Sequence, residues 1–240
     1  MAKRGNGEGV KGSVFLVVGL CLLSIWPCAA KESIVEERVT FPVGDIALEG
    51  LLWAPPQAPT IGVVLCHPHP LYGGDMQNNV VSALADTFQQ AGMATLRFNF
   101  RGVGRSGGEH GGGEAEVEDV KAAVTYLLSR QAVPTVVVAG YSFGSMVGLR
   151  AGAADPRVHK LIGVALPVGV SDPSFLLNVT KPKLLISGDR DNYSPIPALQ
   201  GLFAKLPDPK ALVAVPGADH FFWGQEEEVA KAAVEFLQKD

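Results

Sequence analysis

One stretch decides the fold of this chain: Thr135-Val136-Val137-Val138-Ala139-Gly140-Tyr141-Ser142-Phe143-Gly144. Its first five residues are mostly β-branched and apolar, which predicts a buried strand, and a helix is expected over residues 143–153. The glycines on either side of Ser142 permit a tight strand-to-helix turn. A serine on such a turn projects its hydroxyl out of the sheet, so this G-x-S-x-G pattern indicates an exposed nucleophile.

The same pattern occurs a second time in the chain, at Gly104-Arg105-Ser106-Gly107-Gly108. That segment follows a predicted strand only after a loop, and more loop follows it. Because it lacks the strand–turn–helix setting, we interpret it as a glycine-rich loop. Ser142, rather than Ser106, is therefore the predicted nucleophile.

Strands and helices alternate on both sides of this turn. Apolar runs predict strands over residues 38–42, 46–53, 61–66, 94–99, 135–139, 160–166, 183–186 and 211–215. Helical spacing and end signals predict helices over residues 79–90, 114–129, 143–153, 196–206 and 226–238. This alternation predicts the α/β class, with a three-layer α/β/α sandwich and a mostly parallel sheet of about eight strands. Only about sixteen residues separate the strands at 160–166 and 183–186, which leaves no room for a lid domain.

The composition excludes several classes of protein. The chain has 240 residues and a net charge of −4, so it offers no basic patch for a nucleic acid. A chain of this length can bury a core without metal or disulfide crosslinks. Of its three cysteines, only Cys66 lies beyond residue 30, which precludes an internal disulfide in a processed chain. Cys66 stands in an apolar run and is predicted to be a small core residue.

The first thirty residues have the pattern of a targeting segment. A basic start with Lys3, Arg4 and Lys11 precedes an uncharged apolar run over residues 13–26, and small residues follow up to Ala30. This predicts a secretory signal peptide over residues 1–30, export to the periplasm or the medium, and one domain over residues 31–240. The alternative is a membrane anchor formed by residues 13–26 that is not cleaved. No other contact with a membrane is expected.

A nucleophilic serine needs an imidazole base and a carboxylate that orients the base. His220 follows the strand at 211–215, and both Asp189 and Asp191 follow the strand at 183–186. Because the carboxyl ends of parallel strands meet at one edge of a sheet, these side chains are expected to approach Ser142. Either aspartate can take the carboxylate role, and the other can tie down the loop by accepting bonds from backbone amides.

Two backbone N–H groups are expected to bind the oxyanion that forms during acyl transfer. One belongs to Phe143, which follows the nucleophile, and the other belongs to the loop after the strand at 61–66. Pro68 and Pro70 of that loop have no N–H to donate. The remaining candidates are His69, Leu71 and Tyr72.

Several segments carry a family resemblance: residues 67–74 (HPHPLYGG), residues 97–106 (RFNFRGVGRS), the Ser142 turn, and the Asp191 and His220 loops. Through them, residues 36–240 resemble the α/β-hydrolase superfamily, in particular a small lidless bacterial subgroup with an HPHP loop, related to dienelactone hydrolases. The resemblance implies the chain order nucleophile, acid, base. It favours Asp191 over Asp189, because Gly188 and Pro195 match the acid loop of the superfamily. It also implies that Leu71 is the second oxyanion donor.

These residues together predict a serine hydrolase that cleaves small-molecule carboxylic esters through Ser142, His220 and Asp191, with no metal or cofactor. The alternatives are a thioesterase, a peptidase or amidase with the same residues, and a non-catalytic binding protein of the same fold. His67 and His69 have no third ligand nearby and are interpreted as loop-shaping residues. Arg101 either meets an anionic substrate or pins its own loop.

Overall fold

The computed structural model describes residues 34–239 of the chain. The predicted signal segment, residues 1–30, lies outside the described residues. Within residues 34–239, no helix combines the length and apolar character that a membrane crossing requires.

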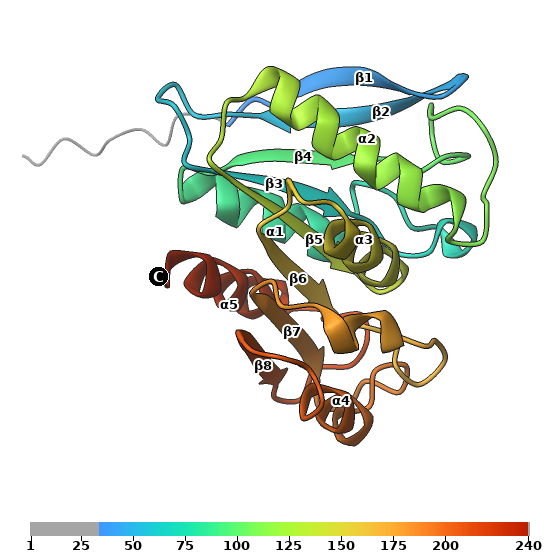
Figure 1. Cartoon of the computed structure of the whole chain (residues 1–240), viewed down its shortest axis with the longest axis vertical. Helices are drawn as coiled ribbons and strands as arrows, with labels where there is room; N and C mark the ends of the chain where they lie inside the picture. Colours follow the sequence, from blue (N-terminus) through green and yellow to red (C-terminus); the bar gives the residue numbers. More distant parts are fainter. Residues whose placement is uncertain (1–33, 240) are drawn as a thin grey trace, which may run out of the picture. The chain divides into compact units, whose positions relative to one another are not determined.

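The centre of the fold is an eight-stranded sheet with the order β1-β2-β4-β3-β5-β6-β7-β8 (Figure 1). β1 pairs with β2, and β2 with β4, in antiparallel fashion, and the five other pairings are parallel. The strands are β1 (Glu37–Val43), β2 (Ile46–Trp53), β3 (Ile61–Cys66), β4 (Ala94–Phe98), β5 (Thr135–Tyr141), β6 (Lys160–Val164), β7 (Lys183–Gly188) and β8 (Lys210–Val215).

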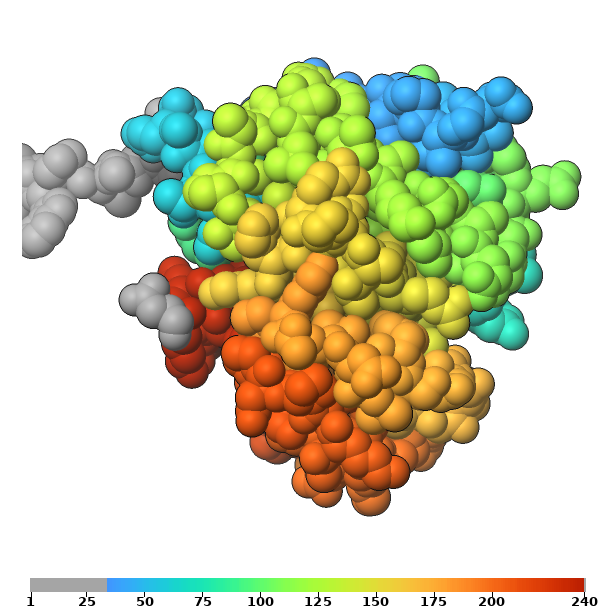
Figure 2. All heavy atoms as spheres, in the orientation of Figure 1, coloured from blue at the N-terminus to red at the C-terminus, as the bar shows by residue number. Residues whose placement is uncertain are grey.

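Helices cover both faces of this sheet. They are α1 (Asn79–Gln90), α2 (Ala115–Arg130), α3 (Phe143–Ala154), α4 (Ile196–Phe203) and α5 (Glu226–Gln238). The buried side chains of α1 and α5 share one apolar cluster with one face of the sheet, and those of α2 and α3 share a second cluster with the other face. Figure 2 shows the second face, with α2 beside the β1–β2 hairpin in blue. The predicted fold class and its three layers are therefore confirmed.

The ends of several elements differ from the sequence prediction for local reasons. β5 continues two residues beyond Ala139, because Gly140 and Tyr141 pair with β6. β6 stops at Val164 rather than Leu166, because Ala165 has a φ of 48° and turns the chain out of the strand. α4 ends at Phe203, three residues early, because the N–H groups of Lys205 and Leu206 bond to carbonyls three residues back rather than four, which ends the α-helical pattern before Pro207. Two 3-10 helices were not predicted: η1 (Pro70–Tyr72) and η2 (Ser174–Asn178).

The parallel strands bring four connecting segments to one edge of the sheet. β3, β5, β7 and β8 run in the same direction, so the segments that follow them gather at their carboxyl ends. The loop after β3 contains η1, the turn after β5 contains Ser142, and the last two loops contain Asp191 and His220. Every predicted site residue therefore lies at this edge.

Candidate active site

Ser142 occupies a strained backbone position between β5 and α3. Its φ and ψ are 54° and −120°, in a region that residues with a side chain rarely adopt. Its N–H donates to the Val164 carbonyl of β6 at 2.9 Å, which fixes the turn against the neighbouring strand. The turn is therefore held by the sheet rather than by the preference of the serine itself.

The two glycines of this turn are required by close backbone contacts. A Cβ at Gly140 would lie 2.1 Å from the Gly144 carbonyl oxygen, and a Cβ at Gly144 would lie 2.4 Å from the Cys66 carbonyl oxygen. Both distances are far below van der Waals contact. The glycines thus let the first turn of α3 rest directly on the end of β3, beside the loop expected to bind the oxyanion.

Three side chains form one hydrogen-bonded chain at this edge. Ser142 Oγ lies 2.9 Å from His220 Nε2, and His220 Nδ1 lies 2.8 Å from Asp191 Oδ2. The other Asp191 oxygen, Oδ1, accepts bonds from the N–H groups of Tyr193 and Ser194 at 2.7 and 2.9 Å. Asp191 is buried, so these bonds fix the carboxylate and, through it, the orientation of the imidazole.

Asp189 ties down its loop, which is the second role that the sequence allowed for one of the two aspartates. Its Oδ1 accepts a bond from the Gly217 N–H at 2.8 Å and so ties the loop after β7 to the turn after β8. No bond joins it to His220 among the described residues. The geometry therefore agrees with Asp191 as the partner of the histidine.

The backbone of the loop that carries His220 is held by Tyr141, the residue before Ser142. The Tyr141 hydroxyl donates to the His220 carbonyl oxygen at 2.8 Å. Burial raises the pKa of this phenol above its ordinary value, so it keeps its proton, and the bond, well into the alkaline range. Sequence reasoning did not single out Tyr141, because nothing near it in the chain indicates a partner 79 residues away.

The loop after β3 does not fit the assignment of Leu71 as an oxyanion donor. The Leu71 N–H donates to the Nδ1 atom of His69 at 3.2 Å, and the side chain is 70% exposed, outside the cavity at Ser142. The Tyr72 N–H is also engaged, by the His69 carbonyl at 3.1 Å. The turn at η1 uses both amides for its own closure, so this geometry gives no support to the expected role of Leu71.

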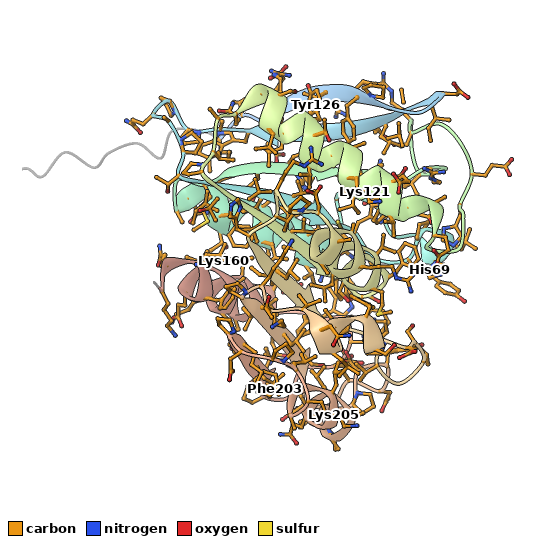
Figure 3. All side chains as sticks on the ribbon, in the orientation of Figure 1. His69, Lys121, Tyr126, Lys160, Phe203 and Lys205 are labelled. Carbon is orange, nitrogen blue, oxygen red and sulfur yellow. The ribbon has the colours of Figure 1, made fainter. Side chains whose placement is uncertain are left out.

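His69 is the remaining candidate of the three. Its N–H has no acceptor among residues 34–239, and the residue lines the cavity beside Ser142. The two rings of His69 and Phe143 lie 4.8 Å apart between centroids, and Figure 3 labels His69 at the end of the fold that carries η1. The Phe143 N–H, at the first position of α3, has no acceptor within the helix.

His67 shapes the loop from a buried position. Its Nδ1–H donates to the Pro68 carbonyl at 2.6 Å, and its Nε2 accepts from the Phe100 N–H at 3.0 Å. Burial lowers the pKa of His67 to about 4, so the ring is neutral at neutral pH. No group of three or more metal-ligating side chains occurs in the described part of the chain.

A cavity of about 1170 Å³ opens over Ser142 and His220. Apolar and aromatic side chains form most of its wall, including Phe143, Met146, Val147, Phe175 and Phe221. The connection between β6 and β7 contains only η2 and adds no lid over the opening. The site can therefore admit an extended substrate.

The second G-x-S-x-G segment has a structural role. Ser106 Oγ accepts from the Glu49 N–H at 3.0 Å and donates to the Asn99 carbonyl at 2.7 Å. The side chain is buried and has no base beside it. Its hydroxyl fastens the loop after β4 to β2.

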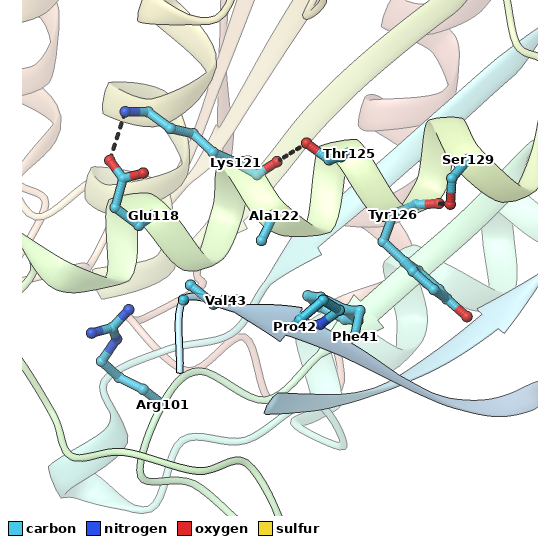
Figure 4. A pocket seen from close by; sticks show the side chains of 11 residues that line it. Phe41, Pro42, Val43, Arg101, Glu118, Lys121, Ala122, Thr125, Tyr126 and Ser129 are labelled. Carbon is cyan, nitrogen blue, oxygen red and sulfur yellow. Dashed lines mark hydrogen bonds and ion pairs between the residues drawn. The ribbon is translucent and has the colours of Figure 1, made fainter. Parts of the chain in front are cut away.

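A second hollow, of about 780 Å³, lies between β1 and α2 (Figure 4). Its polar side chains are engaged with one another or with the helix: Lys121 with Glu118, and Thr125 with the Lys121 carbonyl. Arg101, at one end, binds the buried carboxylate of Asp119 at 2.6 Å. Arg101 thus pins its own loop, and no histidine among the described residues lines this hollow to serve as a base for its hydroxyl groups.

Comparison with known proteins places the chain among hydrolases. The family model described as serine aminopeptidase, S33 (Hydrolase_4) matches residues 62–181. An uncharacterised protein of Rickettsia prowazekii (strain Madrid E) is 33% identical over 191 residues, which are 76% of this chain and 79% of that protein. The family match includes Ser142 and ends before Asp191 and His220.

Two solved structures are similar over most of the chain. An alpha-beta serine hydrolase homologue from Coxiella burnetii is 34% identical with a TM-score of 0.78, over 84% of this chain and 97% of that chain. A lidless α/β serine hydrolase from Xanthomonas campestris is 31% identical with a TM-score of 0.76, over 85% of this chain and 94% of that chain. Both likenesses extend beyond the family match.

Proposed function

The chain belongs to the α/β serine hydrolases of the serine aminopeptidase S33 family, and on this premise we propose that it cleaves carboxylic esters of small molecules. The observation that carries the proposal is the hydrogen-bonded chain from Ser142 through His220 to Asp191, with distances of 2.9 and 2.8 Å. These lengths are those of a nucleophile beside its base and a base beside its orienting carboxylate.

The reaction proceeds in two halves. Ser142 Oγ attacks the ester carbonyl carbon while His220 Nε2 takes the hydroxyl proton, and the imidazolium then gives this proton to the departing alcohol. Water attacks the acyl-enzyme with His220 again as base, which releases the acid and restores the serine. Asp191 keeps the proton of the resting imidazole on Nδ1 and stabilises the imidazolium that forms at each step.

The negative oxygen of each tetrahedral intermediate needs donors held in place beforehand. We assign this role to the N–H groups of Phe143 and His69. The helix position of Phe143 leaves its amide without an internal partner, and the bonds of η1 engage Leu71 and Tyr72 but not His69. The contact of Gly144 with the end of β3 keeps these two segments adjacent.

The acids at the cavity favour esters over peptides. An aminopeptidase must bind the free ammonium group of its substrate, which calls for a carboxylate close to the nucleophile. Of the two acidic side chains that line the cavity, Asp172 is bonded to Ser174, and Glu114 lies beside the cation Arg150, which repels an ammonium group. The same mechanism also applies to thioesters.

The test is covalent labelling followed by turnover. The protein should react with a fluorophosphonate probe, and Ser142→Ala should not. Ser106→Ala is the matched control, because it removes the serine of the other G-x-S-x-G segment, and it should label like the wild type. 4-Nitrophenyl esters, a thioester and an aminoacyl anilide then rank the substrate classes. Equal labelling of the wild type and Ser142→Ala would refute the assignment, and faster anilide than ester cleavage would refute the preference for esters.

A further inference from the structure

One face of α3 forms a continuous wall of the cavity, starting at the nucleophile. Phe143, Met146, Val147 and Arg150 all line the cavity. Their spacing of three and four residues places them on one side of the helix. From Ser142 to Arg150 the helix rises about 12 Å, at about 1.5 Å per residue. The wall therefore leads from the reacting serine to an arginine.

The side chains of α3 that line the cavity between Ser142 and Arg150 are apolar. Phe175 and Val170, from the connection between β6 and β7, also line the cavity. Gly113 lies close to the same wall, since a Cβ at this position would be 3.7 Å from the Phe143 ring and 3.8 Å from Val147. The only cation among the side chains that line the cavity, within the described part of the chain, is Arg150, apart from histidines.

Arg150 has donors available for a ligand. Its Nη1 donates to Glu114, its guanidinium carbon lies 5.7 Å from the centroid of the Phe175 ring, and its Nε and Nη2 have no acceptor among residues 34–239. The side chains of Arg150 and Glu114 are 41% and 81% exposed. Exposed ion pairs of this kind contribute little to stability, so the bond to Glu114 leaves the guanidinium of Arg150 available to a ligand. Helical side chains lean toward the N-terminus, which directs Arg150 toward Ser142.

The wall of α3 lies on the acyl side of the ester. The leaving alcohol must lie beside His220, which protonates it. The ring contacts at the site form two separate groups: His220 with Tyr193 and Phe221, and Phe143 with His69 and His110. The first group therefore faces the alcohol, and the wall that begins at Phe143 is left for the acyl chain.

We propose that the substrates are esters whose acyl chain ends in a carboxylate, and that Arg150 binds this carboxylate at the far end of the apolar wall. The inference rests on the proposed function and names its substrate class. Nε and Nη2 of an arginine match the two oxygens of a carboxylate in a fork-like pair. Asp172, the other acid nearby, is occupied by the N–H and hydroxyl of Ser174.

The first experiment compares turnover of paired substrates. The 4-nitrophenyl monoesters of adipic and suberic acid carry the distal carboxylate, and the hexanoate and octanoate esters lack it. The ratio of kcat/KM between charged and neutral partners should fall about tenfold in Arg150→Gln, the loss expected for a charge-assisted bond. The ratio should be largely retained in Arg150→Lys and should rise in Glu114→Gln. Arg130→Gln removes an arginine of similar exposure at the end of α2, paired with Glu37 of β1, and should not change the ratio.

The second experiment measures binding without turnover. Suberic acid monomethyl ester is titrated calorimetrically into Ser142→Ala protein and into the same protein with Arg150→Gln. About tenfold weaker binding without Arg150 supports the inference, even if no ester is hydrolysed and the proposed function fails. Equal binding, or a turnover ratio that Arg150→Gln leaves unchanged, overturns the inference while ester hydrolysis by the wild type stands.

Discussion

Residues 104–108 and 140–144 share one sequence pattern and have opposite environments. Ser106 Oγ is bonded on both sides by backbone groups, from Glu49 and Asn99. Ser142 Oγ has an imidazole nitrogen at 2.9 Å and a cavity in front of it. The first hydroxyl holds a loop, and the second is available to a substrate.

The glycines of the two segments also have different structural roles. Gly104 and Gly108 have φ values of 57° and 77°, so they permit left-handed turns in a loop, and a Cβ on Gly104 would meet side-chain atoms of Glu49 and Asn99 at 2.3 and 2.6 Å. Gly140 and Gly144 permit close approach, since a Cβ on either would meet backbone atoms within 2.4 Å. The same residue types thus allow a chain reversal in residues 104–108 and close contact between backbone segments at the end of a strand in residues 140–144.

The largest expected effect concerns the partner of the histidine. Asp191→Asn should lower kcat/KM for a 4-nitrophenyl ester about 10⁴-fold, because an amide that donates to Nδ1 stabilises the wrong tautomer. Ser142 would then be almost as inert as Ser106. Asp189→Asn, which alters only the bond to the Gly217 N–H, is the control and should retain activity within about tenfold. If the two variants lose activity equally, Asp191 has no special relation to His220.

Alanine at the last glycine of the elbow should affect folding more than alanine in the loop. Gly144→Ala should lower the free energy of unfolding by about 3 kcal/mol or more, because its Cβ would meet the Cys66 and His67 carbonyl oxygens. Gly107→Ala, whose Cβ would lie 3.3 Å from a side-chain carbon of Ile46, should change it by less than about 1 kcal/mol. Urea unfolding at neutral pH measures both. Similar losses would show that close approach does not distinguish the two segments.

The contribution of His67 to the stability of the protein should depend on pH. His67 accepts the Phe100 N–H, one residue beyond the carbonyl that Ser106 holds. Its folded pKa, lowered by burial to about 4, lies below the ordinary value of 6.5, so the unfolded chain binds the proton first. Stability from this group is present above pH 6.5 and declines toward pH 4, by about 3 kcal/mol in all.

The measurement is the slope of unfolding free energy against pH between 4 and 6.5. In His67→Gln, which cannot titrate, that slope should be smaller than in the wild type by the contribution of one proton. Equal slopes would mean that His67 is protonated in the folded protein or is solvated there.

The smallest effect belongs to Ser106. Ser106→Ala leaves the Glu49 N–H and the Asn99 carbonyl without their partner and should cost about 1–2 kcal/mol of stability. The kcat for ester cleavage, measured well below the unfolding temperature, should match the wild type. A large loss of kcat with intact folding would give this loop a role in the reaction.

Local patterns fixed the elements that the structure contains. The predicted bounds of α1 match the structure at both ends, because Val80, Leu84 and Phe88 recur at helical spacing and the Asn78 side chain caps the first turn. The order of strands and helices, and the turn at Ser142, could likewise be predicted from neighbouring residues. Backbone propensity and apolar periodicity act over a few positions, so the sequence displays them directly.

Contacts between distant segments decided the site. Asp189 and Asp191 are two residues apart and chemically alike, and only the packing of the β8 loop gives one to Gly217 and the other to His220. The family resemblance implied that Leu71 is an oxyanion donor. In the folded chain the turn at η1 engages the Leu71 amide, and the His69 amide has no acceptor among residues 34–239. The sequence alone determined the α/β fold and the serine on its elbow. The tertiary structure decided which carboxylate bonds to His220, which amides the turn at η1 engages and which side chains line the cavity, because those choices depend on contacts between groups that meet only when the sheet is assembled.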